Sequence, residues 1–433
     1  MGGIADYSGA LVLQLPIDEA TLVAIQKRPD RKIKIFSYQA QSDKTRSPFF
    51  EMQLNDFLSD SEPISYQAAR QYFKKNQRTN WAAYVAGVFI VLMKEKKITF
   101  PHGASLLIHS SVPEGKGVSS SAALEVAAMQ AVAALYRISL EPQEIAALCQ
   151  KVENLVVGAA CGIMDQMTAT TGKADKLMAL LCQPAQLKGF VDIPQNINFW
   201  GLDSGERHSV SGSDYSSVRI GAFMGYRMIA AMAGLKENRI QNGIVVRDPL
   251  WNGYLANISP SLFEQRFAAK LPTKISGNDF IKRYSATTDT VTRIDTEKTY
   301  AVRFPTRHPI YEHFRVQIFE ELLTPPVTES KLKLMGELMY QSHLSYSNCG
   351  LGSKGTDLLV RLVRESGSEG GLFGAKITGG GSGGTVVVLG KADAEHGVQK
   401  VAEQYEKITG YRPYIFRHSS CGAVEFGVLE IRV

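Results

Sequence analysis

One segment limits the possible folds of this 433-residue chain more than any other: the glycine loop from Pro113 to Ala122, which opens onto an alanine-rich stretch. Its sequence is PEGKGVSSSA, and no helix breaker follows it as far as Tyr136. Because the β-rich residues 105–109 precede the loop, the pattern predicts a strand, a loop and a helix in that order. Backbone N–H groups and the positive end of a helix then face an anion, which favours phosphate binding. A simple serine N-cap on a good helix is the alternative that these residues leave open.

A second glycine run, GGGSGG, occupies Gly379 to Gly384 late in the chain. The residues on either side of it, 376–378 and 385–389, are rich in β-branched and apolar side chains. A flexible linker is the ordinary interpretation of such a run. With these flanks we expect instead that the glycines lie inside a packed element, where they let a backbone come close to a ligand or another strand.

A third segment, CGIMDQ, places Asp165 in a glycine-containing turn. It follows residues 142–157, whose apolar side chains recur every three or four residues and predict a helix, with Glu153 beside the apolar stripe. An acid at such a position is usually a cap or part of a surface turn. Whether Asp165 acts as a base therefore depends on its neighbours.

Composition excludes several classes of protein. The net charge is +6, but the basic residues are scattered and their densest run, 94–97, is only four residues long, so we expect a solvated surface and no nucleic-acid partner. The longest apolar run, 85–93, is about half of the roughly 20 residues that a membrane span requires, and no signal peptide opens the chain. Five widely spaced cysteines suit reduced thiols. We therefore expect a cytoplasmic protein without a membrane partner; monomer and homodimer both remain open.

The organisation along the chain predicts two domains, 1–210 and 211–433. The polar stretch Ser209 to Ser217 is the expected hinge between them. The elements expected are a small antiparallel sheet within residues 10–55, a helix at 80–93, a strand at 199–203, a helix at 218–233, an irregular region at 240–300, helices at 314–323 and 331–347, strands at 374–378 and 385–389, a helix at 393–407 and a final strand at 423–431.

The three motifs PxxxGxSSSA, CGIMDQ and KITGGGSGG, in this order, resemble those of the GHMP kinases, and CGIMDQ is similar to the galactokinase branch. The resemblance extends to WAAYV at 81–85 and to the segment from Arg207-His208 to Tyr215, so it covers nearly the whole chain. It implies an α+β, two-domain GHMP kinase fold. The N-terminal domain would be like ribosomal protein S5 and the C-terminal domain ferredoxin-like.

The resemblance also implies roles for individual residues. Asp165 is expected near the anomeric hydroxyl of a sugar, as general base or as its electrostatic orienter. Ser121 and Glu153 are expected to hold Mg²⁺ against the phosphates of ATP. Trp81 is expected to border the adenine, although a core position explains it at least as well. The other residues expected to bind ATP are Gly115, Gly117, Val118, Ser119, Ser120, Ser121, Ala122, Gly380, Gly381 and Ser382. The expected sugar contacts are Gly3, Ile4, Asp6, Asp203 and Tyr215.

The opening segment bears on which sugar is bound. Galactokinases carry Glu-His-Thr-Asp-Tyr where this chain has Gly3-Ile4-Ala5-Asp6-Tyr7. In that family the Glu and His approach the C6 end of the sugar, and the Asp holds ring hydroxyls. A pentopyranose has no C6 hydroxymethyl group, so Gly3 removes a carboxylate that such a sugar would leave unpaired.

This segment, together with residues 112–122, 375–384 and 342–352, is most similar to the L-arabinose kinases of the branch, so L-arabinose is the expected substrate. The alternatives are retuned packing around a hexose, a galactokinase, a uronic acid kinase, or a catalytically weak sensor of sugar and ATP on the same fold. A uronic acid would need a basic partner for its carboxylate near Gly3 and Ile4, which this segment does not supply.

The family's first motif begins with an Arg-containing strand just before the segment that matches Met1. In the family that Arg lies close to the catalytic Asp. We expect a form of the protein with about ten native upstream residues to turn over faster; equal rates for the two forms would count against this placement of the motif.

Overall fold

The computed structural model describes residues 1–207, 213–240 and 243–431. Two compact units make up the chain, and each is assembled from separated stretches. The large unit comprises Met1–Leu15, Gly115–Val118 and Asp175–His418, and the small unit comprises Pro16–Glu114, Ser119–Ala174 and Ser419–Val433. The predicted boundary near residue 210 and the first part of the predicted hinge lie outside the described residues. The rest of the hinge, from residue 213, begins a helix.

A four-stranded sheet with the order β2-β7-β3-β4 forms one layer of the small unit. Its strands are β2 (Thr21–Lys27), β3 (Lys32–Ser37), β4 (Phe49–Gln53) and β7 (Ala104–Ser110). The strands predicted within residues 10–55 are present, but they do not form one antiparallel sheet. β7 lies between β2 and β3 and pairs in parallel with β3, and residues 11–14 pair in another sheet. A parallel pair requires a crossover connection, which the intervening helices supply.

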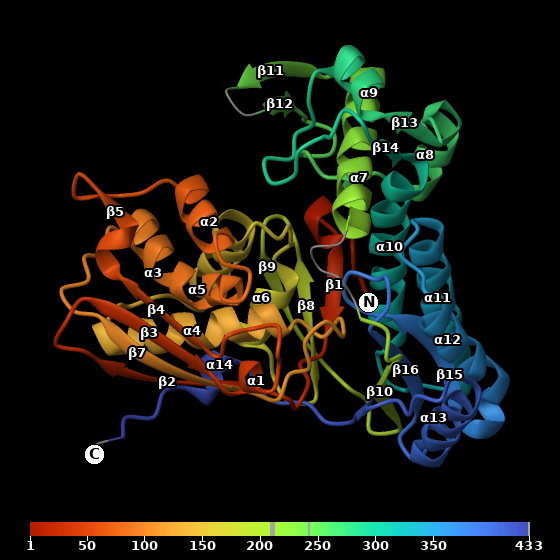
Figure 1. Ribbon diagram of the computed structural model, residues 1–433. Coiled ribbons are helices and arrows are strands. Elements are labelled where there is room, and N and C mark those ends of the chain that lie inside the picture. The colour runs from red at the N-terminus through yellow and green to blue at the C-terminus, as the bar shows by residue number, and fades with distance from the viewer. Residues whose placement is uncertain (208–212, 241–242, 432–433) are drawn as a thin grey trace. The chain divides into compact units, whose positions relative to one another are not determined.

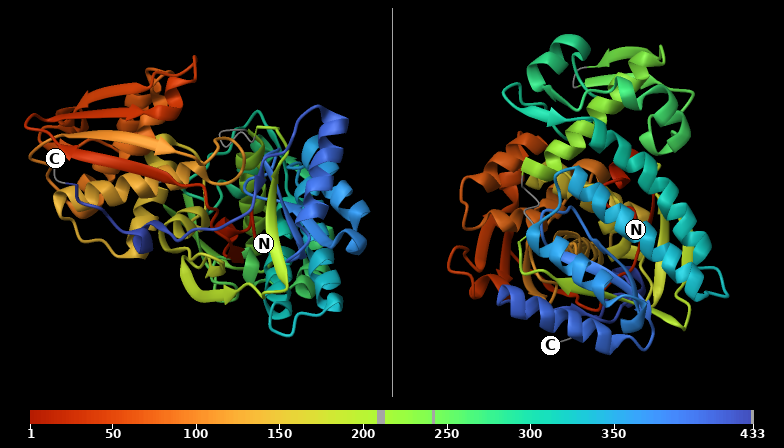
Figure 2. Two further views of the ribbon diagram at one scale, coloured as in Figure 1. Left: turned by 90° about the horizontal axis from the view of Figure 1, so that it is seen from below. Right: turned by 90° about the vertical axis from the view of Figure 1, so that its right-hand side faces the viewer.

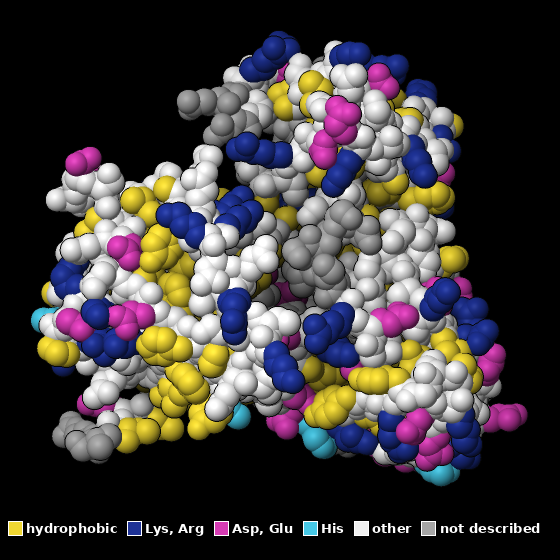
Figure 3. Space-filling view, viewed as in Figure 1, with side chains coloured by type: hydrophobic (Ala, Val, Ile, Leu, Met, Phe, Trp, Pro, Cys, Tyr) yellow, Lys and Arg dark blue, Asp and Glu magenta, His cyan; other side chains and the backbone are white. Residues whose placement is uncertain are grey.

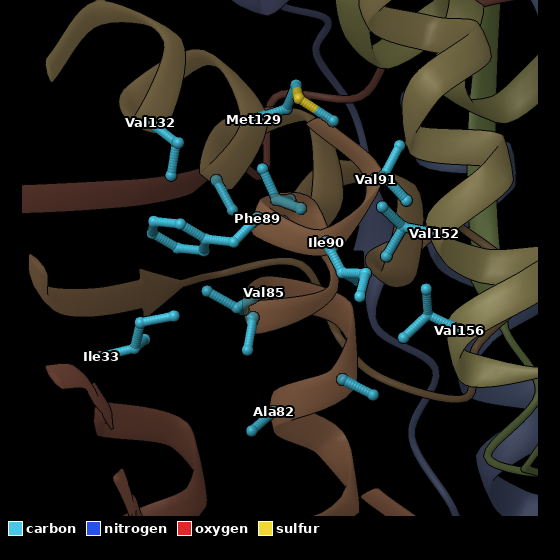
Figure 4. Close-up of a cluster of buried hydrophobic side chains, with 14 of the residues drawn as sticks. Ile33, Ala82, Val85, Phe89, Ile90, Val91, Met129, Val132, Val152 and Val156 are labelled. Atoms are coloured by element: carbon cyan, nitrogen blue, oxygen red, sulfur yellow. The ribbon is translucent and has the colours of Figure 1, made fainter. Parts of the chain in front are cut away.

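Helices cover one face of this sheet, as Figure 1 shows. The apolar helix α3 (Ala83–Lys96) is buried over most of its length and packs with α4 (Ser120–Tyr136) and α5 (Pro142–Lys151). Figure 4 shows Phe89 of α3 near Val132 of α4, and Val91 of α3 near Val152. The remaining elements of the small unit are α1 (Tyr38–Gln41), η2 (Leu54–Phe57), β5 (Leu58–Ser59), β6 (Glu62–Pro63), α2 (Tyr66–Lys74), η3 (Asn80–Ala82), the π-helical η4 (Val152–Val157), α6 (Met164–Thr171) and α14 (Ala423–Phe426).

The large unit contains a four-stranded sheet with the order β15-β16-β10-β17. Its strands are β10 (Ile197–Asp203), β15 (Leu372–Ile377), β16 (Thr385–Lys391) and β17 (Ile415–Phe416), which confirms the strands predicted at 199–203, 374–378 and 385–389. Helices α11 (Glu329–Asn348) and α12 (Lys354–Ser366) contact β15, and α13 (Glu395–Thr409) packs against α12. Figure 2 shows these helices against the strands. Strand β10 therefore shares a sheet with strands that follow it by about 170 residues or more.

A second sheet of the large unit has the order β1-β8-β9, with β1 (Leu11–Gln14), β8 (Lys176–Leu181) and β9 (Gln186–Asp192). Helix α10 (Arg303–Leu322) contacts β1 and packs against α7 (Ser213–Met232) and α11. The region 240–300 was predicted to be irregular, and that prediction is wrong. The strand β11 (Lys236–Ile240) ends at the first residue of this region. The region itself holds β12 (Gly243–Arg247), η5 (Leu255–Asn257), α8 (Pro260–Arg266), η6 (Ala268–Lys270), β13 (Lys274–Ser276), α9 (Gly277–Tyr284) and the start of β14 (Thr299–Ala301). The other short elements of this unit are η1 (Asp6–Ser8) and η7 (Ser368–Gly370).

The final strand predicted at 423–431 is also wrong. The segment begins with the short helix α14, and β-strand pairing is absent from the described residues that follow it. The side chains of Leu429 and Ile431 are 79% and 81% exposed. Alternating apolar residues form a strand only where a partner strand is available, and the described residues supply none here.

The surface and the thiols agree with the composition. Lys and Arg side chains are scattered among acidic ones on the face shown in Figure 3. The five cysteines lie within the described ranges, and none of them is joined in a disulfide. Within the described ranges, we find no helix that is both long and apolar enough to cross a membrane.

The contact between α11 and β15 generates a prediction for Gly336. Ala at a helix interior is normally about 1 kcal/mol more favourable than Gly, but a Cβ atom at Gly336 would lie 2.0 Å from the carbonyl oxygen of Phe373. We expect Gly336→Ala to lower the free energy of unfolding by about 1–3 kcal/mol, measured by urea denaturation. The control is Ser330→Ala on an exposed position of the same helix, which should change it by less than about 0.5 kcal/mol. A stabilised Gly336→Ala protein would contradict the close packing.

Candidate active site

The glycine loop of the first motif lies against the turn between β15 and β16. The Thr378 hydroxyl donates to the carbonyl oxygen of Gly117 at 3.0 Å, and the Thr385 hydroxyl donates to that of Lys116 at 2.8 Å. The structure therefore brings together the first and third motifs, which are separated by more than 250 residues.

Close backbone contact explains the glycines of this turn. A Cβ atom at Gly384 would lie 2.6 Å from the Lys116 carbonyl oxygen, and one at Gly379 would lie 2.8 Å from that of Gly117. Both glycines also have positive φ angles, 83° and 59°, where an L side chain is strained. The run is part of a packed turn, as predicted, and the linker interpretation is wrong. Gly381 (φ 81°) and Ser382 (φ 60°) share this left-handed backbone.

Asp203, at the end of β10, also holds the glycine loop. Its carboxylate lies 2.8 Å from the Lys116 ammonium and accepts hydrogen bonds from the Tyr411 hydroxyl at 2.5 Å and the Gly205 N–H at 2.9 Å. These partners place Asp203 beside the loop, and its expected contact with a sugar stays a prediction.

The start of α4 has no side-chain cap. Ser119 stands at the N-cap position with φ 62°, and its side chain makes no capping hydrogen bond. Gly115 and Gly117 also have positive φ angles, 70° and 67°. The serine N-cap alternative is therefore wrong. Backbone N–H groups at the start of α4, from Ser120 to Ala122, belong to the group that a helix leaves without intrahelical partners.

A buried cluster of acidic and amide side chains lies in the small unit. Glu125 on α4 and Glu153 on the π-helical turn are both almost wholly buried. The amide nitrogen of Gln166 on α6 donates to Glu153 at 2.7 Å and to Glu125 at 3.3 Å. Asp165, in the first turn of α6, is half-buried. The sequence predicted Glu153 and Asp165 as site residues and missed Glu125 and Gln166.

Burial shifts both carboxyl groups toward their protonated forms. Burial raises the pKa of Glu153 to about 7. Hydrogen bonds from Ser121, Cys161 and Gln166 offset the effect of burial only in part, and the negative charge of Asp165 raises the pKa further. The pKa of Glu125 is raised well above its ordinary value by burial and by the charge of Glu153. Asp165 and Ser121 both influence the pKa of Glu153, so the three residues interact electrostatically. Strong pKa shifts of this kind are frequent at catalytic sites.

The donor atoms of this cluster fit Mg²⁺. Mg²⁺ prefers oxygen ligands and is usually held by one or two carboxylates together with substrate phosphates. Glu153 and Ser121 supply a carboxylate and a hydroxyl, and Oε1 of Glu125 is buried without a hydrogen-bond partner. No group of three or more His, Cys, Asp or Glu side chains within the described residues could hold a metal ion unaided. A cation here would therefore depend on further ligands from a bound phosphate.

In the large unit, α10 fixes the backbone of the opening segment. Oε1 of Glu312 accepts a hydrogen bond from the Gly2 N–H at 3.0 Å, and Nε2 of His308 lies 3.0 Å from the Gly3 carbonyl oxygen. Burial lowers the pKa of His308 to about 4, so its ring is neutral at pH 7. Because a carbonyl can only accept, Nε2 carries the ring proton and Nδ1 accepts from the Ser345 hydroxyl at 2.8 Å.

The expected sugar contacts Ile4, Asp6 and Tyr215 lie in this same part of the large unit. Ile4 is 1% exposed and has φ 50°, which is rare for a β-branched residue and marks a constrained backbone. Asp6 is 5% exposed, and Tyr7 next to it packs edge-on against Tyr215 at 6.0 Å between ring centroids. Ile4 and Tyr215 belong to one apolar cluster with Tyr346. Three expected contacts are thus brought together.

The region 240–300 supports this segment. Arg219 lies over the Tyr7 ring at 5.4 Å and forms a buried ion pair of 2.9 Å with Asp289. A Cβ atom at Gly9 would lie 2.4 Å from the Tyr254 ring. Residues of this region therefore fix the position of the segment that carries Asp6.

Trp81 belongs to the core of the small unit. Its ring is 8% exposed within the main hydrophobic cluster, and its indole N–H donates to the Ser47 carbonyl oxygen at 2.9 Å. The core interpretation explains these contacts, and the expected contact with adenine stays a prediction.

A sequence signal existed for two of the candidate residues that were missed, Glu125 and Gln166. Glu125 is the one acid in an otherwise apolar stretch from Ala122 to Met129, four residues after Ser121 and so on the same side of the helix. Gln166 ends the CGIMDQ motif. His308 and Tyr346 carry no comparable signal, because their roles depend on contacts with residues more than 300 positions away.

This fold is that of a GHMP kinase. The family model for the GHMP kinases N terminal domain matches residues 83–173, and the model for the GHMP kinases C terminal region matches residues 320–407. The chain belongs to the GHMP kinase superfamily, as its three motifs predicted.

Among curated proteins, the chain is similar to L-arabinokinase from Arabidopsis thaliana. The two are 48% identical over 475 residues, an alignment that covers 100% of this chain and 46% of that protein. The chain thus spans about half the length of this relative.

Solved structures confirm the α+β fold. The crystal structure of Lactococcus lactis galactokinase complexed with galactose matches with a TM-score of 0.72 at 22% identity, over 98% of this chain and 91% of that one. Methanococcus jannaschii mevalonate kinase matches with a TM-score of 0.58 at 15% identity, over 97% and 95% of the two chains.

The raised pKa of Glu153 predicts how stability depends on pH. Between its ordinary value near 4.5 and about 7, the native carboxyl binds more protons than the unfolded one, so the free energy of unfolding falls as pH rises through this window. We therefore compare the free energy of unfolding of the wild type with that of Glu153→Gln, measured by urea denaturation without Mg²⁺. We expect the wild-type value minus the variant value to fall by up to about 3 kcal/mol between pH 4.5 and pH 8. A difference that rises with pH would show that Glu153 is stabilised as a carboxylate.

Proposed function

We propose that this chain transfers the γ-phosphoryl group of ATP to the anomeric hydroxyl of L-arabinose, giving L-arabinose 1-phosphate and ADP. The observation that carries the kinase reaction is the cluster of Asp165, Glu153 and Ser121, in which a serine at the uncapped start of α4 faces a buried carboxylate. The 48% identity to L-arabinokinase supports the choice of sugar. Gly3 supports it as well, since the site then lacks a carboxylate that a pentose would leave unpaired.

In this proposal the glycine loop binds the phosphates of ATP through backbone N–H groups. Charge that develops on the transferred phosphoryl is stabilised by these amides and by the positive end of α4. The hydroxyls of Thr378 and Thr385 fix the loop in place, so little reorganisation is needed during transfer. Gly380, Gly381 and Ser382 line the phosphates from the turn between β15 and β16.

Asp165 takes or orients the proton of the anomeric hydroxyl. Ser121 and Glu153 would hold Mg²⁺, which neutralises phosphate charge when bound. Asp6, Ile4 and Tyr215 bind the sugar, and the ion pair between Arg219 and Asp289 keeps their segment rigid.

The reaction is tested by measuring ADP release with ATP and Mg²⁺ against L-arabinose, D-galactose, D-galacturonate and D-glucuronate. Phosphorus NMR then identifies the phosphorylated carbon. We expect the highest kcat/KM with L-arabinose, and phosphate on C1. A preference for D-galactose would support the proposed phosphoryl transfer but contradict L-arabinose as the substrate. Binding of sugar without turnover would favour the sensor alternative.

Asp165→Asn tests the catalytic role directly. The amide keeps the size of the side chain but cannot accept a proton, so we expect kcat to fall about 10²-fold or more. The matched control is Asp279→Asn, which removes an acid from the first turn of another helix, α9, and should leave kcat unchanged. Undiminished turnover in the Asp165→Asn protein would remove this residue from the mechanism.

A further inference from the structure

The space beside Gly3 is filled by another residue, Tyr346 of α11. A Cβ atom at Gly3 would lie 1.9 Å from the Tyr346 hydroxyl oxygen, and 3.3 Å from its Cζ atom and from the Gly379 carbonyl oxygen. Gly3 is not among the residues with positive φ, so its backbone conformation does not itself demand a glycine. A side chain at position 3 is instead excluded by its clash with the Tyr346 hydroxyl.

Tyr346 is fixed in this position. Its ring is wholly buried, and its hydroxyl donates to the Gly379 carbonyl oxygen at 3.0 Å. The His308 ring packs edge-on against it at 5.3 Å, and the Lys376 ammonium lies 5.1 Å from the ring centroid. Moving the ring would break a partly buried hydrogen bond and leave a carbonyl without that partner, which is costly.

The backbone of Gly3 is equally fixed from the other side. His308 donates to its carbonyl oxygen, and Glu312 accepts from the N–H of Gly2. The Glu312 carboxylate is itself held by the Ser342 hydroxyl at 2.8 Å and by Arg315 at 2.8 Å. Neither the segment nor the tyrosine can therefore give way without disturbing buried polar groups.

We propose that Tyr346 determines which sugar this site accepts. Its phenol occupies the volume that a side chain at position 3 would otherwise fill, and so closes the site against the hydroxymethyl group that distinguishes a hexopyranose from a pentopyranose. The inference rests on the proposed function, in which residues 3–6 bind the sugar. Tyr346 thus favours aldopyranoses that end at C5, and Gly3 is the residue that this tyrosine requires.

The geometric part is tested by a double-mutant cycle between Gly3→Ala and Tyr346→Phe. With the hydroxyl removed, the nearest atoms to the new Cβ atom are 3.3 Å away, a tight contact that small shifts relieve. We expect Gly3→Ala alone to lower both the Tm and kcat/KM for L-arabinose. In the Tyr346→Phe background the same change should cost at least about tenfold less in kcat/KM, and less in Tm.

Tyr405→Phe is the matched control, because it also removes a buried hydroxyl that donates to a backbone carbonyl, that of Ser204 at 2.7 Å. It should not rescue Gly3→Ala. Equal costs of Gly3→Ala in the wild-type and Tyr346→Phe backgrounds would overturn the proposal.

The specificity part is tested by the ratio of kcat/KM for L-arabinose to that for D-galactose. We expect the ratio to fall in the order wild type, Tyr346→Phe, Tyr346→Leu, by about tenfold or more for Leu. An unchanged ratio in a folded Leu variant, or in the Phe variant if Leu does not fold, would overturn the proposal. If wild type does not phosphorylate L-arabinose, the proposed function fails, whereas the Tm values of the cycle still report whether Tyr346 closes position 3.

Discussion

The docking of the glycine loop on the turn between β15 and β16 is the constraint on which the candidate site of the large unit depends. Two threonine hydroxyls hold the carbonyl groups of Lys116 and Gly117, and glycines at 379 and 384 allow the two backbones to touch. With these carbonyls directed at the turn, the loop is fixed where the chain continues into α4. The same turn provides the Gly379 carbonyl that binds Tyr346. The glycine loop and Tyr346 are therefore both held by one turn of the large unit.

The two buried carboxylate sites differ in how their charge is balanced. Glu312 lies beside Arg315 and Lys376, and despite its burial its pKa is lowered by them. Glu153 and Glu125 are also buried, and burial is the largest influence on both pKa values and raises them. Hydrogen bonds offset this only in part at Glu153, and the charge of Glu153 raises the pKa of Glu125 further. A compensated buried carboxylate is typical of a structural role, whereas an uncompensated pair is unfavourable unless a cation or proton is taken up. This contrast supports a structural role for Glu312 and a functional one for Glu153.

Local sequence signals predicted much of this fold. The loop and helix from Pro113 to Tyr136 and the strands on either side of the late glycine run follow from patterns within about 20 residues. The candidate residues Asp165 and Glu153 came instead from the resemblance of the motifs to the GHMP kinases. The errors concern partners distant in sequence. Nothing local shows that β7 lies between β2 and β3, or that the apolar residues after 423 have no strand to pair with. Tyr346 resembles an ordinary core residue of a helix, and only its contact with Gly3 gives it a specific role.

The pairing of β10 with β16 and β17 determines the order in which the chain can fold. The large unit takes segments from residues 1–15, 115–118 and 175–418, so its contacts have a high average separation in sequence, which slows folding. By contrast, most of the small unit is complete once residue 174 has been synthesised. During translation the helices α3 and α4 can thus pack on their sheet early. Strand β10 stays unpaired until β16 and β17, nearly 200 residues later in the chain, have been synthesised. In that interval its apolar face is exposed to aggregation or to chaperones.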